Sequence, residues 1–96
     1  MPTYEALARF LREYGALSPQ ARQAFLSALD QFIEHVDAGT FPPSLRVKRI
    51  QGTRGLWEMS WAPDGRAVFE YGEPQHGKGR HVVWRRIGTH DVFRDP

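Results

Sequence analysis

The sequence predicts an α+β domain in which an N-terminal helical hairpin packs on a mostly antiparallel four-stranded sheet. Two observations carry this prediction. Apolar residues recur every three or four positions up to Gly39, and from Leu45 onward they alternate with polar residues. Between these halves lies the linker Thr40–Pro43, whose two prolines cannot continue a helix. The change of period at the linker therefore separates a helical half from a strand half.

Length and composition indicate one soluble domain. Ninety-six residues are enough for one compact domain and too few for two, and a hydrophobic content of 41% is typical of a chain that builds a core. Because the chain has no cysteine, disulfides, thiolate metal sites and cysteine nucleophiles are excluded. No stretch resembles a signal peptide or approaches the ~18 apolar residues of a membrane-spanning helix. We expect a single domain over residues 1–96, cytoplasmic and without a membrane segment.

Two amphipathic helices are expected in the first half. Thr3 is expected to cap the first helix, and Gly15 to end it. The apolar positions of the first helix are Tyr4, Leu7, Ala8, Leu11 and Tyr14. The second helix begins with Ser18 as N-cap, followed by Pro19, and continues up to Gly39. Its apolar positions are Ala21, Phe25, Ala28, Leu29, Phe32, Ile33 and Val36.

Four strands are expected in the second half, over Leu45–Gly52, Leu56–Ala62, Arg66–Tyr71 and Arg80–Ile87. The sequence Pro-Asp-Gly between the second and third strands is typical of a type I turn completed by a left-handed glycine, so these strands form a hairpin. If Ala62 pairs with Arg66, a ladder of large apolar side chains faces the helices. This register pairs Trp57 with Tyr71, Met59 with Phe69 and Trp61 with Ala67. Glu58 and Arg66 then lie on the opposite face.

Basic residues concentrate in the second half, although the net charge is only +2. Residues 1–44 contain three basic and five acidic residues, whereas residues 45–96 contain ten and six. Two runs hold no acid, and their basic residues are Arg46, Lys48, Arg49 and Arg54 in the first, and Lys78, Arg80, Arg85 and Arg86 in the second. Such runs favour a phosphate-binding surface. The alternative is that they are solvated strand edges, where basic residues discourage aggregation.

Three residues supply the groups that metal-free RNA cleavage requires. The face that carries Glu58 and Arg66 also looks toward the chain end that supplies His90. The reaction needs a proton acceptor, a proton donor and fixed positive charge beside the phosphate. Arginine holds two phosphate oxygens, and histidine exchanges protons near neutral pH. The alternative is a surface arginine with its carboxylate partner and an unrelated loop histidine. No cofactor and no metal site is expected, because His76 and His81 have no third ligand nearby.

Several segments together resemble the RelE/ParE toxin superfamily. After the helical hairpin they are Phe41–Gly52, Gly55–Met59, Gly65–Phe69 and Ile87–Phe93. The resemblance covers nearly the whole chain. It implies a RelE-like fold and the toxin of a type II toxin–antitoxin system, which in the RelE, YoeB and HigB branches is a ribosome-dependent endoribonuclease that cleaves mRNA in the ribosomal A site. It also implies a cognate antitoxin, with ribosome and mRNA as further partners.

The resemblance also implies roles for single residues. Arg66 matches the arginine that stabilises the phosphate, and His90 matches the general acid of the YoeB branch. Ser44 stands where that branch has its glutamate base, so Glu58 is expected to be either the base or a group that orients Arg66. The residues expected to bind RNA are Arg46, Lys48, Arg49, Arg85 and Phe93. The alternative function is a toxin-fold protein without catalysis that binds RNA or a protein such as gyrase.

Overall fold

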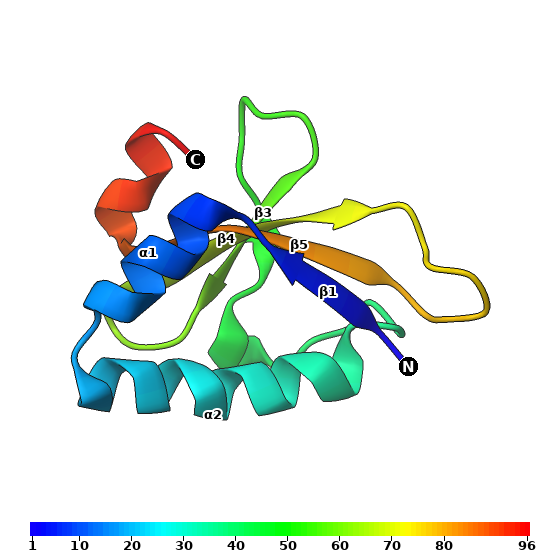
Figure 1. Ribbon diagram of the computed structural model, residues 1–96, viewed down its shortest axis with the longest axis horizontal. Coiled ribbons are helices and arrows are strands. Elements are labelled where there is room, and N and C mark those ends of the chain that lie inside the picture. Colours follow the sequence, from blue (N-terminus) through cyan, green and yellow to red (C-terminus); the bar gives the residue numbers. More distant parts are fainter.

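Two helices pack on one five-stranded sheet in the computed structural model, which describes the backbone of residues 1–96 and the side chains of residues 1–92, 95 and 96. The elements are β1 (Thr3–Ala6), α1 (Ala8–Ala16), α2 (Pro19–His35), the 3-10 helix η1 (Pro43–Leu45), β2 (Lys48–Arg49), β3 (Leu56–Ser60), β4 (Gly65–Gly72), β5 (His81–Thr89) and the 3-10 helix η2 (His90–Arg94). The sheet order is β1-β5-β4-β3-β2, with β1 parallel to β5 and the other pairs antiparallel. Figure 1 shows α2 running beneath the sheet and η2 near the end of α1. The α+β prediction is confirmed, with five strands where four were expected.

Aromatic rings join the helices to the sheet. The Trp84 ring of β5 lies 5.9 Å from that of Phe10 in α1, 5.6 Å from Phe25 and 5.2 Å from Phe32 in α2, and 5.4 Å from Phe69 in β4, measured between ring centroids. All five side chains are buried. Because burying one such side chain stabilises the fold by about 1.5–3 kcal/mol, this cluster is the centre of the core.

The first predicted helix begins too early, because Thr3–Ala6 forms a strand instead. This segment lies parallel to β5, and two of its side chains bond to the buried His81. The Thr3 hydroxyl lies 2.8 Å from His81 Nδ1, and Glu5 Oε1 lies 3.0 Å from His81 Nε2. Pairing with β5 and the side-chain bonds to His81 therefore stabilise a strand at Thr3–Ala6, although the local sequence pattern favours a helix. Gly15 lies inside α1 rather than ending it.

The second helix follows the sequence pattern closely. Ser18 caps it, since its hydroxyl oxygen accepts a hydrogen bond from the Ala21 N–H at 3.1 Å. After His35 the chain turns at Gly39, which has a positive φ of 74° and donates its N–H to His35 O at 3.0 Å. Among the residues that the structure describes, no helix has both the length and the apolar character needed to cross a membrane.

The first predicted strand is shorter than expected and covers only Lys48–Arg49. The two prolines begin the 3-10 turn η1, closed by hydrogen bonds from Leu45 N–H to Pro42 O and from Arg46 N–H to Pro43 O. Arg46 then has a left-handed conformation, with φ 49° and ψ 44°, and the extended strand cannot start before it. Leu45 consequently enters the core from a turn rather than from a strand.

The hairpin register differs from the prediction by two residues. Ser60, not Ala62, lies opposite Arg66, and Trp57 lies opposite Phe69. The turn begins one residue earlier than expected, because Gly65 donates its N–H to Ala62 O and accepts from the Trp61 N–H. Since the shift is even, every side chain keeps its predicted face. Met59, Ala67 and Phe69 therefore still face the helices and are buried. The last strand extends to Thr89, two residues beyond the prediction.

Candidate active site

Strand pairing brings Arg66 and His90 to the same end of the sheet. Gly65 lies opposite Thr89 and Arg66 opposite Gly88 in the β4–β5 ladder. His90 follows directly and begins η2. The Thr89 hydroxyl accepts a hydrogen bond from the Asp91 N–H at 3.4 Å and so caps this 3-10 turn. Two residues that are far apart in the sequence thus become neighbours through backbone pairing.

His90 forms an exposed pair with an aspartate of the β3–β4 turn. Its Nδ1 lies 2.7 Å from Asp64 Oδ1, and its Nε2 lies 3.9 Å from Asp91 Oδ1. The side chains of His90 and Asp64 are each 65% exposed. The hydrogen bond from His90, together with the charges of His90 and Arg66, lowers the pKa of Asp64 below its ordinary value. Asp64 is therefore a carboxylate at neutral pH, and it can orient the imidazole by accepting a hydrogen bond from Nδ1.

The Arg66 guanidinium is held over its own turn. Nη1 donates to Gly65 O at 2.9 Å, to Pro63 O at 3.2 Å and to Ala62 O at 3.3 Å. Within the described part of the chain, Nε and Nη2 donate to no acceptor. One nitrogen therefore fixes the position of the guanidinium, and the other two can receive phosphate oxygens.

Glu58 lies on the same face of the sheet as Arg66, one cross-strand pair away. Glu58 pairs with Val68, and Ser60 with Arg66, so the side chains of all four point to one side. The carboxyl group is buried, with only 8% of the residue exposed, and Lys48 Nζ lies 3.9 Å from its Oε1. Glu58 therefore shares a face of the sheet with Arg66, but it is enclosed and paired with Lys48.

Arg66 lines a cleft of about 510 Å³ between the hairpin turn and α2. Ser44 and Arg46 of the η1 region and Ser60 of β3 line the same cleft. Ser44 stands where the resemblance to the YoeB branch implies a glutamate base. It lines the same cleft as Arg66 but carries a hydroxyl instead of a carboxylate. The cleft offers guanidinium and hydroxyl donors, a set suited to phosphate oxygens.

The residues predicted to bind RNA come from two parts of the fold, the segment of η1 and β2 and the strand β5. Arg46 is exposed on the Arg66 cleft, and Arg49 stands over the Trp57 ring with its Cζ 6.0 Å from the ring centroid. Lys48 is paired with Glu58. Arg85 projects from β5, where its Nη1 lies 3.7 Å from Glu70 Oε1. Phe93 lies outside the residues whose side chains are described.

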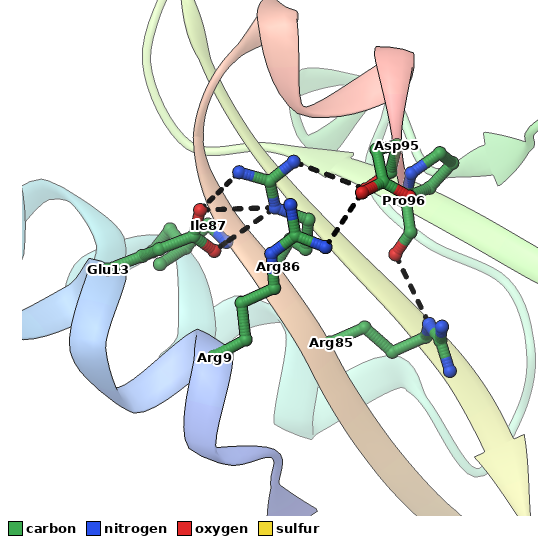
Figure 2. A network of polar contacts seen from close by, with 7 residues as sticks. All are labelled: Arg9, Glu13, Arg85, Arg86, Ile87, Asp95 and Pro96. Carbon is green, nitrogen blue, oxygen red and sulfur yellow. Dashed lines mark hydrogen bonds and ion pairs between the residues drawn. The ribbon is translucent and has the colours of Figure 1, made fainter.

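A network of polar contacts anchors the segment that follows β5, as Figure 2 shows. Its members are Arg9, Glu13, Arg85, Arg86, Ile87, Asp95 and Pro96. Glu13 of α1 accepts from Arg86 Nε at 3.1 and 3.2 Å, from Arg86 Nη2, and from the Ile87 N–H at 3.3 Å. Arg86 Nη1 in turn donates to Asp95 O at 3.2 Å. The chain that carries His90 is thus fixed at both ends, by β5 and by this network.

Electrostatics at Glu13 favour the charged form. Burial alone would raise the pKa of Glu13, but the hydrogen bonds from Arg86 and Ile87 and the charges of Arg86 and Arg9 outweigh it and lower the pKa. In turn, the hydrogen bond with Glu13 raises the pKa of Arg86. Both groups are charged across the physiological pH range.

Asp64 is the site residue that the sequence prediction missed. Its signal was present, because Pro-Asp-Gly places an aspartate in the turn two residues before Arg66. The link to His90, 26 residues away, follows only from the strand pairing. Among the described residues, no group of three His, Asp or Glu side chains comes together in a way that could hold a metal ion.

The comparisons with known proteins show what this chain is similar to. The sequence matches no protein-family model and no curated protein sequence. The structure, however, resembles the Escherichia coli DinJ–YafQ complex, with a TM-score of 0.66, 16% identity, and coverage of 96% of this chain and 97% of the other. The RelB–RelE antitoxin–toxin complex from Methanococcus jannaschii matches with a TM-score of 0.61 and 13% identity, covering 94% of this chain and 94% of the other. A YoeB/ParE toxin from Agrobacterium tumefaciens matches with a TM-score of 0.65 and 12% identity, covering 92% of this chain and 98% of the other. The chain therefore has the fold of the RelE/ParE-type toxins, as the sequence resemblance predicted.

Proposed function

We propose that this protein is the toxin of a type II toxin–antitoxin system and that it cleaves mRNA on the ribosome. The observation that carries the proposal is the placement of Arg66 and His90 at one end of the sheet, with Asp64 holding His90 at 2.7 Å. The full-length likeness to YafQ, RelE and YoeB/ParE toxins supports the toxin role. The DinJ–YafQ and RelB–RelE structures are complexes, which supports a cognate antitoxin as a partner.

In the proposed reaction the ribose 2′-oxygen attacks the adjacent phosphorus, and the bond from phosphorus to the 5′-oxygen breaks. The products are a 2′,3′-cyclic phosphate and a 5′-hydroxyl. Arg66 Nε and Nη2 neutralise the charge that develops on the phosphate oxygens. Protonated His90 gives its proton to the leaving 5′-oxygen, and Asp64 holds the imidazole in position. Glu58 accepts the 2′-hydroxyl proton or, if it only orients the Arg66 surface, that proton passes to water.

The test is primer extension on mRNA incubated with programmed ribosomes and the purified protein. We expect cuts that depend on ribosomes. Arg66→Ala should reduce the cleavage rate about 10²- to 10³-fold, because it removes the donors for the charged phosphate. Arg12→Ala, which removes an exposed arginine of α1 outside both basic runs, is the matched control and should cleave normally. Undiminished cleavage by a folded Arg66→Ala protein would overturn the catalytic role.

A second candidate function is binding without catalysis. It is favoured by two observations: Arg66 Nη1 is occupied by three carbonyls, and Glu58 is buried beside Lys48. In that case the protein would inhibit its target, an RNA or a protein such as gyrase, by occupying it. Absence of cuts with and without ribosomes, combined with growth inhibition on expression, would favour this candidate.

A further inference from the structure

A second cavity lies between the linker that follows α2 and the end of the β3–β4 hairpin opposite the Asp64 turn. Its volume is about 500 Å³, within the ~300–1,000 Å³ range of small-molecule sites. Three aromatic rings line it, from Phe41 of the linker, Trp57 of β3 and Tyr71 of β4. Arg46 and Arg80 also line it. The proposed reaction uses none of the three rings.

The rings are held in place by the core. Phe41 stacks on Phe32, with centroids 5.1 Å apart and planes inclined by 21°. Trp57 stacks on Phe69 at 6.4 Å and 18°, and it meets Tyr71 edge-on at 5.8 Å and 72°. Since these contacts fix the rings before any ligand arrives, a planar group binding against them would lose little additional side-chain entropy.

Unpaired positive charge surrounds these rings. The Cζ of Arg80 lies 4.7 Å from the Tyr71 ring centroid, and the Cζ of Arg49 lies 6.0 Å from that of Trp57. Across the described residues, neither of these guanidiniums nor that of Arg46 forms an ion pair, and no carboxylate lines the cavity. The nearby Asp37 is engaged by the backbone N–H of Arg80 at 2.8 Å. The cavity is thus suited to an anion that carries a planar, stackable group.

The backbone at Arg46 connects this cavity with the candidate active site. Arg46 is the one non-glycine residue of the described chain with a positive φ, a conformation that a side chain with a Cβ disfavours. In this conformation Arg46 lines both the aromatic cavity and the Arg66 cleft. A polyanion lying across Arg46 would therefore enter both.

We propose that the aromatic cavity binds one nucleotide of the single-stranded RNA whose cleaved linkage lies at Arg66. The base stacks against Trp57 and Tyr71, and Arg46 and Arg80 hold its phosphate. Stacking on aromatic side chains and arginine is the way in which proteins bind unpaired bases with little sequence preference. This inference rests on the proposed RNA-cleaving function and adds a substrate-binding subsite to it.

The Tyr71 hydroxyl provides a further contact. Burial raises the pKa of Tyr71 above its ordinary value, against the opposing effect of Arg80, so the phenol is protonated at neutral pH. A protonated phenol can donate a hydrogen bond to an acceptor on a base edge. The ring and the hydroxyl therefore have separable roles, which two substitutions can distinguish.

The experiment measures binding apart from cleavage. The probe is a fluorescein-labelled 2′-O-methyl hexanucleotide of mixed sequence, which lacks the attacking hydroxyl, and the readout is fluorescence anisotropy. Arg80→Ala and Tyr71→Leu are each expected to raise the Kd about tenfold, whereas Tyr71→Phe should raise it less than about threefold. Arg12→Ala is the matched control, because Arg12 is an exposed arginine of α1 and its loss changes the net charge equally. Thermal melts establish that each variant is folded.

Three results would overturn the inference. The first is a wild-type protein that does not bind the probe. The second is equal loss of affinity in Arg80→Ala and Arg12→Ala, because the cavity would then contribute only diffuse charge. The third concerns polyglutamate as a competitor. If polyglutamate displaces the probe, and this displacement is lost in Arg80→Ala but unchanged in Tyr71→Leu, the cavity binds an acidic protein segment instead. A protein that binds through Tyr71 and Arg80 but cuts no mRNA would keep the subsite and lose the nuclease.

Discussion

The Asp64–His90 pair and the Glu13–Arg86 pair hold the two ends of η2, and they differ in exposure and in the number of hydrogen bonds. His90 is the first residue of η2, and Arg86 donates to Asp95 O directly after η2. Glu13 and Arg86 are joined by several hydrogen bonds, and their side chains are only 22% and 16% exposed. Asp64 and His90 are joined by a 2.7 Å hydrogen bond, Asp91 Oδ1 lies 3.9 Å from His90 Nε2, and the side chains of Asp64 and His90 are each 65% exposed. A pair with many partners and little solvent fixes the chain, whereas an exposed pair contributes little to stability and stays accessible to a substrate.

This difference separates stability from chemistry within a single segment. Figure 2 shows Arg86 and Arg85 reaching back to Asp95 and Pro96, which close the segment that begins at His90. The anchoring network can therefore be weakened without touching the proposed proton donor, and the donor can be removed without loosening the anchor. Substitutions at each pair should affect different measurements.

Among substitutions at the two pairs, the largest effect is expected for His90→Ala on cleavage. Loss of the general acid should lower the cleavage rate by about 10²-fold, while the free energy of unfolding changes by no more than about 0.5 kcal/mol, because the pair is exposed. Ribosome-dependent primer extension and urea unfolding measure the two quantities. His76→Ala, in the exposed loop before β5, is the control and should leave both unchanged. A full cleavage rate in the folded His90→Ala protein would remove His90 from the mechanism.

The opposite pattern is expected for Glu13→Gln. The substitution keeps the shape but removes the charge that Arg86 faces, and it should lower the free energy of unfolding by about 2–3 kcal/mol. The remaining folded protein should cleave at a rate within about threefold of the wild type, because Glu13 is outside the site. Chemical unfolding tests this prediction. If cleavage fell as far as in His90→Ala while stability did not change, the two pairs would not be separable as argued.

Glu13 also predicts a dependence of stability on pH. Its folded-state pKa is lowered, so its contribution is complete above the ordinary value of 4.5 and is lost as the pH falls through the folded-state value. The wild-type protein should therefore lose more stability than Glu13→Gln between about pH 5 and about pH 3. Urea midpoints measured across this interval would reveal the difference. Parallel pH curves for the two proteins would show that Glu13 is not the group responsible.

The fold could be predicted where local signals and tertiary packing agree. Ser18-Pro19 and the Phe25, Phe32 and Val36 positions predict α2, and the structure confirms its cap and its buried face. β1 was missed because Thr3–Ala6 becomes a strand only through pairing with β5, which lies almost eighty residues later. The left-handed Arg46 was missed for another reason: residue type does not predict that conformation outside glycine and asparagine.

The candidate site was predictable by residue type and face, but not by contact. Glu58 and Arg66 lie on one side of the sheet in the predicted register and in any register that differs from it by an even number of residues, and the observed shift of two residues is such a change. The burial of Glu58 and the Asp64–His90 bond depend on distances across the sheet, which the sequence pattern does not contain. The proposed roles of Arg66, His90 and Glu58 remain predictions.

A smaller effect is expected for Asp64→Asn. Asparagine can keep a hydrogen bond to His90 but accepts it less strongly than a carboxylate, so the imidazole is held less firmly and the cleavage rate at neutral pH should fall about three- to tenfold. Single-turnover cleavage measures this change. Asp30→Asn removes an exposed carboxylate on α2 and is the matched control. A loss as large as that of His90→Ala would mean that Asp64 takes part in proton transfer itself.

The smallest effect, and one of opposite sign, is expected for Gly15→Ala in α1, the helix that carries Glu13. An added Cβ at Gly15 meets no atom within 4 Å, and alanine favours the helix over glycine by about 0.5–1 kcal/mol. The free energy of unfolding should thus increase by this amount, with no change in the cleavage rate. The contrast is Gly65→Ala beside Arg66, where the Cβ would lie 2.6 Å from the Trp61 ring and force the hairpin turn to shift. Thermal melts with parallel cleavage assays measure both variants. Equal destabilisation by the two substitutions would contradict this account of the hairpin turn, because Gly15 has room for a Cβ and Gly65 does not.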